Sequence, residues 1–95
     1  MQSTSGQYIA EQNYSVHNGL SGMFINQIIP DNEGNVWVLL YNNKGIDKIN
    51  PRTREVTKLF ADELTGEKSP NYLLCDEDGL LWVGFHGGVM RINPK

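Results

Sequence analysis

The amino-acid sequence predicts an all-β protein made of two antiparallel, four-stranded units. Three observations favour this class. A motif recurs after 45 residues, and self-similarity at a fixed period is a stronger indication of fold than local propensity. Short apolar runs alternate with turns rich in glycine, asparagine and aspartate. No segment combines a helical period with helix caps, and the best helical candidate, 60–67, is interrupted by Thr65 and Gly66.

The repeated motif is defined by identical residues that recur in register. At an offset of 45 the pairs are Asn26/Asn71, Asp31/Asp76, Gly34/Gly79, Trp37/Trp82 and Val38/Val83. Further downstream, the stretch Gly45–Pro51 matches Gly88–Pro94 at an offset of 43. Two residues are therefore lost from one loop, which is a change that repeated β-units tolerate.

Each copy is predicted to form strands joined by short turns. In the first copy the expected strands are 26–30, 36–41, 46–50 and 55–60. In the first turn, the Asp31 side chain can accept a hydrogen bond from the backbone ahead of it, and Gly34 accepts a positive φ. The next turns contain Gly45 and Pro51, and the second copy repeats the first three strands over 71–93.

The size of the repeat and the apolar composition of its second strand indicate a β-propeller. Four strands in about 45 residues correspond to one propeller blade. Val36–Tyr41 and Leu80–Phe85 are unbroken apolar runs, which is typical of strands that are covered on both faces. Blades stack face to face, so their central strands are covered in this way. The predicted fold is thus a β-propeller fragment with two four-stranded antiparallel blades.

The strand inventory is circularly shifted with respect to whole blades. Gln7–Tyr14 is predicted to be the outer strand of a preceding blade, 26–60 the first blade, and 71–95 a second blade that lacks its outer strand. We therefore expect Gln7–Tyr14 to pair with Val89–Asn93 of another chain. This head-to-tail contact would build a homo-oligomer, a ring on the order of two to four chains if the rotation closes.

Composition narrows the classes of partner. The 95 residues carry a net charge of −3, whereas nucleic-acid binding requires a basic face. The eight lysines and arginines are scattered, which argues against an anionic membrane surface. No apolar run approaches the roughly 20 residues of a membrane helix. Cys75 is the single cysteine, so an internal disulfide is excluded, and its place in an apolar strand predicts an unreactive thiol.

The pattern Asp-x-x-Gly-x-x-Trp-Val, followed by a glycine-containing turn and an apolar-x-x-Ile-Asn-Pro ending, resembles the two-component regulator propeller repeat over about residues 14–95. The resemblance implies the periplasmic sensor region of a hybrid two-component regulator of Bacteroides-type bacteria, which binds carbohydrate-derived signals upstream of a kinase. It also implies a longer parent protein with more blades and a membrane anchor. The family often has Gly-Thr after the tryptophan pair, whereas this sequence has Leu39-Leu40 and Gly84-Phe85, a departure that bears on ligand contacts.

The repeated residues favour structural roles over chemical ones. Trp37 and Trp82 occupy matching mid-strand positions, so burial between blades is favoured over stacking on a sugar. Asp31 and Asp76 are expected to cap turns, because one carboxylate per repeat makes a poor site for a hard cation. The predicted structural set is Trp37, Trp82, Asp31, Asp76, Gly34 and Gly79.

The sequence predicts no catalytic residue, no metal site and no cofactor. His17 and His86 are the two histidines, and the repeat does not relate them. No Ser-His-Asp, Cys-His or paired-carboxylate arrangement follows from the spacing. The chain is therefore predicted not to be an enzyme.

The predicted binding face carries the loops that lead into the innermost strands and the loops that join the second strand to the third. These loops are 15–25, 62–70, 41–44 and 86–87. Loops on a rigid scaffold are the usual positions of function. Their planar and amide side chains suit an oligosaccharide, and the candidate ligand-binding residues are Tyr41, Asn42, Asn43 and His86.

The leading functional hypothesis is a ligand-sensing module within an extracytoplasmic, periplasmic propeller. It rests on fold-level analogy. One alternative is a propeller enzyme similar to the streptogramin lyases of the virginiamycin B type, which would need a metal and a histidine base contributed by several blades. Another alternative is an interaction scaffold without a small ligand.

Overall fold

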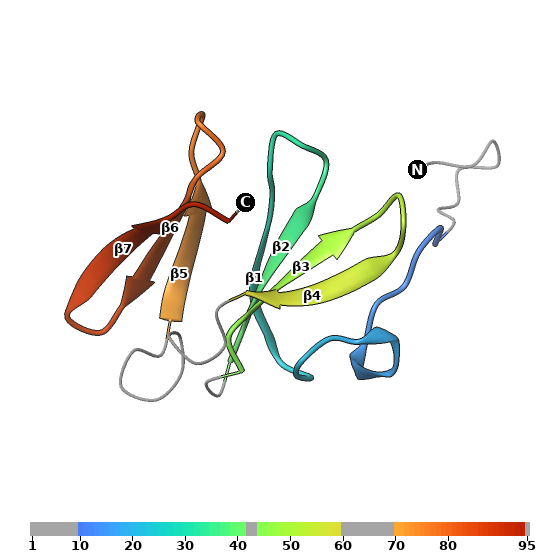
Figure 1. Cartoon of the computed structure of the whole chain (residues 1–95). Helices are drawn as coiled ribbons and strands as arrows, with labels where there is room; N and C mark the ends of the chain where they lie inside the picture. The colour runs from blue at the N-terminus through green and yellow to red at the C-terminus, as the bar shows by residue number, and fades with distance from the viewer. Residues whose placement is uncertain (1–9, 42–43, 60–69, 95) are drawn as a thin grey trace, which may run out of the picture.

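The computed structural model describes residues 10–41, 44–59 and 70–94. They form two antiparallel sheets that lie side by side (Figure 1), which confirms the predicted all-β class and the propeller-fragment architecture. The strands are β1 (Ile25–Pro30), β2 (Val36–Leu40), β3 (Ile46–Asn50) and β4 (Glu55–Leu59) in the first sheet, and β5 (Pro70–Cys75), β6 (Leu81–Phe85) and β7 (Gly88–Ile92) in the second. Within these ranges the one helical element is the short 3-10 turn η1 (Val16–Asn18). No helix in the described part is long and apolar enough to cross a membrane.

The two copies of the sequence repeat share one backbone register. Each strand pairs with its neighbour in sequence, in the orders β1-β2-β3-β4 and β5-β6-β7. Ile29 lies opposite Trp37 in the first sheet, and Leu74 lies opposite Trp82 in the second. Both innermost strands, β1 and β5, also carry a bulge near their first residue. The repeat in sequence is thus a repeat in geometry.

A single buried cluster joins the facing sides of the two sheets. Its fully or nearly fully buried members are Trp37, Leu39, Ile46, Leu59, Leu73, Leu81, Val83 and Ile92. The Trp37 side chain is 2% exposed, as predicted. Removing this much apolar surface from water is the main favourable contribution to folding. The cluster also explains the unbroken apolar run of β2, which is covered from both sides.

A side-chain amide fixes how the two innermost strands meet. The Gln27 Nε2 donates to the Leu73 carbonyl oxygen at 2.7 Å, and the Gln27 Oε1 accepts from the Leu73 N–H at 3.0 Å. Gln27 on β1 therefore satisfies both backbone groups of one residue on β5. Part-buried backbone groups need such partners. The second copy has Tyr72 at the position of Gln27, so this clamp is specific to the first sheet.

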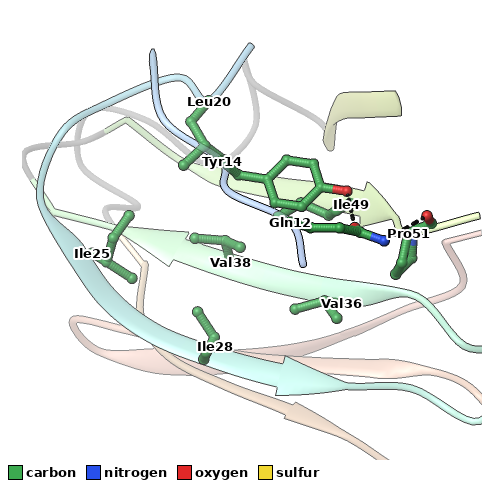
Figure 2. Close-up of a pocket in the computed structure, with 9 residues that line it drawn as sticks. All are labelled: Gln12, Tyr14, Leu20, Ile25, Ile28, Val36, Val38, Ile49 and Pro51. Atoms are coloured by element: carbon green, nitrogen blue, oxygen red, sulfur yellow. Dashed lines mark hydrogen bonds between the residues drawn. The ribbon is translucent and has the colours of Figure 1, made fainter. Parts of the chain in front are cut away.

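The far side of the first sheet carries a second apolar cluster. Leu20, Val38, Leu40 and Ile49 are buried there, and Tyr14 packs against them. Residues 10–14 cross this side without joining a strand ladder. The strand predicted over 7–14 is therefore not formed in 10–14, and residues 7–9 lie outside the described residues. The physical reason is that this segment meets side chains of the sheet rather than a free strand edge (Figure 2).

Trp82 does not share the burial of Trp37. It is 38% exposed, so the prediction that both tryptophans are buried between blades is wrong for Trp82. Its neighbours Leu81 and Val83 point into the cluster between the sheets, and alternate residues of a strand point to opposite faces. Trp82 thus lies on the side of the second sheet that is turned away from the first, where Arg91 lies over its ring but no other sheet of the described residues packs against it.

Candidate ligand-binding face

The described parts of the loops predicted to bind ligand lie at one end of the sheets, where β1 begins and where β6 turns into β7 (Figure 1). Residues 62–69 of the predicted loop 62–70 lie outside the described residues. A pocket of about 290 Å³ opens at this end, between the loop before β1 and the connection from β2 to β3. It is lined by Val16, Ser21, Gly22, Met23, Phe24, Tyr41 and Lys44. The face that the sequence singles out for binding is thus hollowed in the structure.

The loop before β1 begins with a capped turn. The Ser15 Oγ accepts a hydrogen bond from the His17 N–H at 3.2 Å, and the Asn18 Oδ1 accepts one from the Ser15 N–H at 3.1 Å. Together they form a capping box around η1. Gly19 ends the turn with a φ of 113°, a conformation that other residues rarely adopt. These caps set the direction in which the loop approaches the pocket.

A buried carboxylate ties this loop to the sheet. Asp47 on β3 is fully buried, and its carboxylate accepts hydrogen bonds from the Ser21 N–H at 2.7 Å and from the Ser21 Oγ at 2.8 Å. A buried charge is tolerated only when it is well hydrogen-bonded. Because Ser21 and the following Gly22 line the pocket, Asp47 positions one of its walls. The second copy has Met90 at the position equivalent to Asp47.

The pocket surface is mainly apolar and aromatic. Met23 and Phe24 are exposed, and Tyr41 is 51% exposed. The Tyr41 N–H donates to the Phe24 carbonyl oxygen at 3.0 Å, which places the two aromatic residues beside each other. Aromatic rings with a phenolic hydroxyl provide a stacking surface together with a hydrogen-bonding group, and Lys44 adds an amine. This chemistry suits a ligand that has both apolar faces and hydroxyl groups.

The structure places the predicted ligand-binding residues unequally. Tyr41 lines the pocket. His86 lies exposed in the turn between β6 and β7 and does not line this pocket. Asn42 and Asn43 lie outside the described residues. Sequence reasoning did not single out Met23 and Phe24, although two large apolar residues at the end of a polar loop are a signal that could have found them.

The Asp-x-x-Gly turns lie at the opposite end of the sheets (Figure 1). The Asp31 Oδ1 accepts from the Glu33 and Asn35 N–H groups at 2.9 Å each, and its Oδ2 accepts from the Trp37 Nε1 at 2.9 Å. Burial alone would raise the pKa of Asp31, but the hydrogen bonds from Asn35, Trp37 and Glu33 outweigh it, so the pKa is lowered. Gly34 completes the turn with a φ of 86°.

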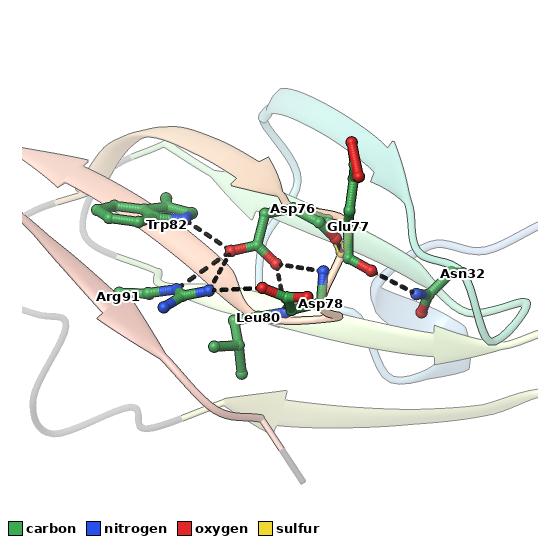
Figure 3. A network of polar contacts seen from close by, with 8 residues as sticks. Asn32, Asp76, Glu77, Asp78, Leu80, Trp82 and Arg91 are labelled. Carbon is green, nitrogen blue, oxygen red and sulfur yellow. Dashed lines mark hydrogen bonds and ion pairs between the residues drawn. The ribbon is translucent and has the colours of Figure 1, made fainter.

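The second turn repeats this arrangement and adds an arginine (Figure 3). The Asp76 Oδ1 accepts from the Asp78 and Leu80 N–H groups, and its Oδ2 accepts from the Trp82 Nε1 at 2.9 Å and the Arg91 Nε at 3.1 Å. The hydrogen bond from Leu80, assisted by those from Trp82, Arg91 and Asp78, lowers the pKa of Asp76 to about 2. In both copies the carboxylate therefore holds the turn and the tryptophan together.

The remaining ionisable groups of the described residues include no cluster suited to a metal ion. Among the described residues, no group of three His, Cys, Asp or Glu side chains is placed to hold one. The pKa of the Cys75 thiol is raised by burial and by the negative charges of Asp31 and Asp76. A raised pKa keeps the thiol protonated and weakens it as a nucleophile.

Comparisons with known proteins agree with this architecture. A family model described as two component regulator propeller matches residues 19–42, which include β1 and β2. No curated protein matches the sequence. Four chains of solved structures match. One of them, the extracellular domain of a protein assigned as a one component system in B. thetaiotaomicron, is 99% identical over 99% of this chain, with a TM-score of 0.87.

The chain spans 13% of that solved domain. The matched residues 19–42 include the Asp31 turn of this chain and the strand that carries Trp37. The chain therefore contains a match to the two component regulator propeller repeat over residues 19–42, and it is nearly identical to part of that extracellular domain.

Proposed function

We propose that this chain is part of the extracytoplasmic sensing region of a bacterial regulator and that it binds a carbohydrate-derived signal. The observation that carries the proposal is the aromatic pocket beside Tyr41, on the loop face of the sheets. The relatives support the regulator part, since the matching solved domain is extracellular and comes from a one component system. The resemblance in sequence suggested a hybrid two-component regulator, and the proposal covers both architectures.

The pocket supports the carbohydrate part by its chemistry. Saccharides present apolar ring faces that stack on aromatic side chains and hydroxyls that bond to polar groups at the rim. Phe24 and Tyr41 offer the rings, and the Asp47–Ser21 tether keeps the opposite wall in place. Both comparisons name regulators rather than enzymes, so we propose binding without catalysis. We also propose a periplasmic location, which the extracellular assignment of the matching solved domain supports.

The binding proposal is tested with a panel of neutral and acidic oligosaccharides displayed on an array, followed by calorimetry on any that bind. Tyr41→Ala should weaken binding by at least about tenfold, because it removes a stacking surface. Tyr72→Ala is the matched control, since Tyr72 is similarly exposed, at 57%, but lies on β5 away from the pocket. Binding that survives Tyr41→Ala, or that is lost equally in both variants, would overturn the proposal.

We also propose that copies of the chain associate head to tail by completing each other's blades. Supporting this idea, β7 has a strand neighbour on one side only within the described residues.

A further inference from the structure

Lys44 gives the pocket beside Tyr41, called the Tyr41 pocket below, a positive charge. The other residues that line it are the neutral Val16, Ser21, Gly22, Met23, Phe24 and Tyr41. Lys44 is exposed, and within the described part of the chain the ion pairs are those of Arg91 with Asp76 and Asp78. The lining therefore presents an ammonium group that no described carboxylate neutralises, although the whole chain has a net charge of −3.

The stem of Lys44 packs against a glycine of the opposite loop. Gly22 is buried, and a Cβ atom added to it would lie 2.9 Å from the Lys44 Cγ and 3.2 Å from the Lys44 Cβ. Only a glycine allows such a close approach without a shift of the loop or of the lysine. The preceding residue, Ser21, is held by the buried Asp47 carboxylate. The wall that carries the ammonium group is thus built by close packing on a tethered loop.

A second lysine reaches the same connection from β4. The Lys58 Nζ donates to the Lys44 carbonyl oxygen at 2.8 Å. Across the strand pair, Lys58 lies opposite Asp47, whose carboxylate is fully buried and accepts from Ser21. The positive charge of Lys58 offsets the negative charge of Asp47 below the loop, so the charge of Lys44 is left without a counter-charge. The sum of these three charges is positive.

This arrangement belongs to the first copy alone. The contacts that build it join residues within 21–58, so they do not depend on the packing of a neighbouring sheet. The second copy has only residues 86–87 where the first has 41–44, and it has Glu67 at the position of Gly22. The repeat therefore forms its strands without a lysine or a glycine at these places, and their presence is explained by what the pocket binds.

We propose that the ligand of the Tyr41 pocket is an acidic saccharide, with a carboxylate or sulfate group that Lys44 binds while Tyr41 stacks on a sugar ring. This inference rests on the proposed function, because it names the class of ligand for the same pocket. Hydrogen bonds between an ammonium group and an anionic oxygen are stronger than those between neutral groups. A pocket wall also screens the attraction less than open water does. An acidic saccharide supplies the counter-charge that Lys44 lacks among the described residues, whereas a neutral one does not.

The test compares acidic saccharides with neutral partners of the same rings and linkages. The probes are uronic acid oligomers beside their carboxyl-reduced forms, and sulfated galactan oligomers beside their desulfated forms. In calorimetry at low salt, the acidic form of the preferred pair should bind at least about tenfold more tightly than its neutral form. The preference should decrease when the ionic strength is raised to about 0.15 M or more, because salt screens the attraction.

Variants then assign the preference to Lys44. Lys44→Met keeps an unbranched stem against Gly22 but removes the charge, so affinity for the acidic form should fall to that of the neutral form, whose binding stays unchanged. Lys44→Arg keeps the charge and should keep the preference. Lys48→Met is the matched control, since it changes the net charge equally but alters a lysine that lies over the Trp37 ring, 5.7 Å from its centre, and does not line the pocket.

The outcomes separate this inference from the proposed function. Equal binding of acidic and neutral forms overturns the inference and leaves saccharide binding in place. A preference that survives Lys44→Met, or that Lys48→Met removes as well, also overturns the inference, because the charge of the whole chain rather than Lys44 would then produce it. Binding of neither form overturns the proposed function and the inference together.

Discussion

The two copies of the repeat build the same local structure and place it in different surroundings. In both, an aspartate accepts two backbone hydrogen bonds within its turn and a third from a tryptophan ring. In both, a cation lies over that ring, Lys48 at 5.7 Å and Arg91 at 5.4 Å. Yet Trp37 is buried and Trp82 is partly exposed. The comparison teaches that local hydrogen bonds position the tryptophan ring, whereas the neighbouring sheet determines how much the ring contributes to the stability of the fold.

The largest expected difference between the copies is the effect of removing each tryptophan. Trp37→Ala should cost about 3–5 kcal/mol of unfolding free energy, because it empties a buried site, and this is a large part of the stability of a small domain. Trp82→Ala should cost about 1–2 kcal/mol, because Trp82 is 38% exposed and removal of its ring empties no enclosed site. Urea unfolding measures both, with Trp37→Phe as a milder substitution if Trp37→Ala does not fold. Equal costs would show that the neighbouring sheet contributes little.

The buried carboxylate is the next difference to test. Asp47→Met gives the first copy the residue that the second copy has at Met90. The change leaves the Ser21 N–H and hydroxyl without their acceptor and should cost about 1–3 kcal/mol. Chemical unfolding measures the loss, and Ser21→Ala should account for part of it. A variant as stable as the unaltered chain would mean that the tether contributes no stability.

Acidification should lower the stability of the folded chain by protonating the aspartates of the two turns. The pKa of Asp76 is lowered from its ordinary value of 3.8 to about 2 in the folded chain. A group with a lowered folded pKa contributes stability above its unfolded pKa, and this contribution disappears as the pH falls from about 4 to about 2. The pKa of Asp31 is lowered as well, so both copies contribute to the loss in this window.

Urea midpoints measured at several pH values below 5 test this expectation. Asp76→Asn removes the titrating group and should lose less stability on acidification than the unaltered chain. A variant whose midpoint falls just as steeply would place the acid sensitivity elsewhere.

The smallest expected effect comes from exchanging the cations over the tryptophans. Arg91→Lys makes the second copy resemble the first, and it removes the fork that donates to Asp76 and Asp78. The Arg91 side chain is substantially exposed, and surface ion pairs contribute little. The melting temperature should therefore fall by no more than about 2 °C. A much larger decrease would indicate that the ion pairs of Arg91 with Asp76 and Asp78 contribute more than exposed pairs usually do.

Much of the fold could be predicted from the sequence because its signals are local. The turns at Asp31 and Asp76 and the apolar runs after them depend on neighbours a few residues away. The repeat then doubles every such signal, so the strand limits agree closely with prediction. For the candidate site, Tyr41 was predicted because it follows a strand on the loop face. The contribution of Met23 and Phe24 to the pocket was not predicted, because it depends on how the loop before β1 folds back onto the sheet.

By itself, the sequence determined that this chain forms antiparallel propeller sheets and which residues hold each turn. Only the tertiary structure decided that Trp37 is buried while Trp82 is exposed, that Asp47 reaches Ser21 across 26 positions, and that residues 10–14 lie against the far side of the first sheet. The physical reason is that hydrogen bonds within a turn join residues close in sequence, whereas burial depends on whichever surface packs against a residue. Two identical motifs therefore differ as soon as one of them has a neighbouring sheet that the other lacks.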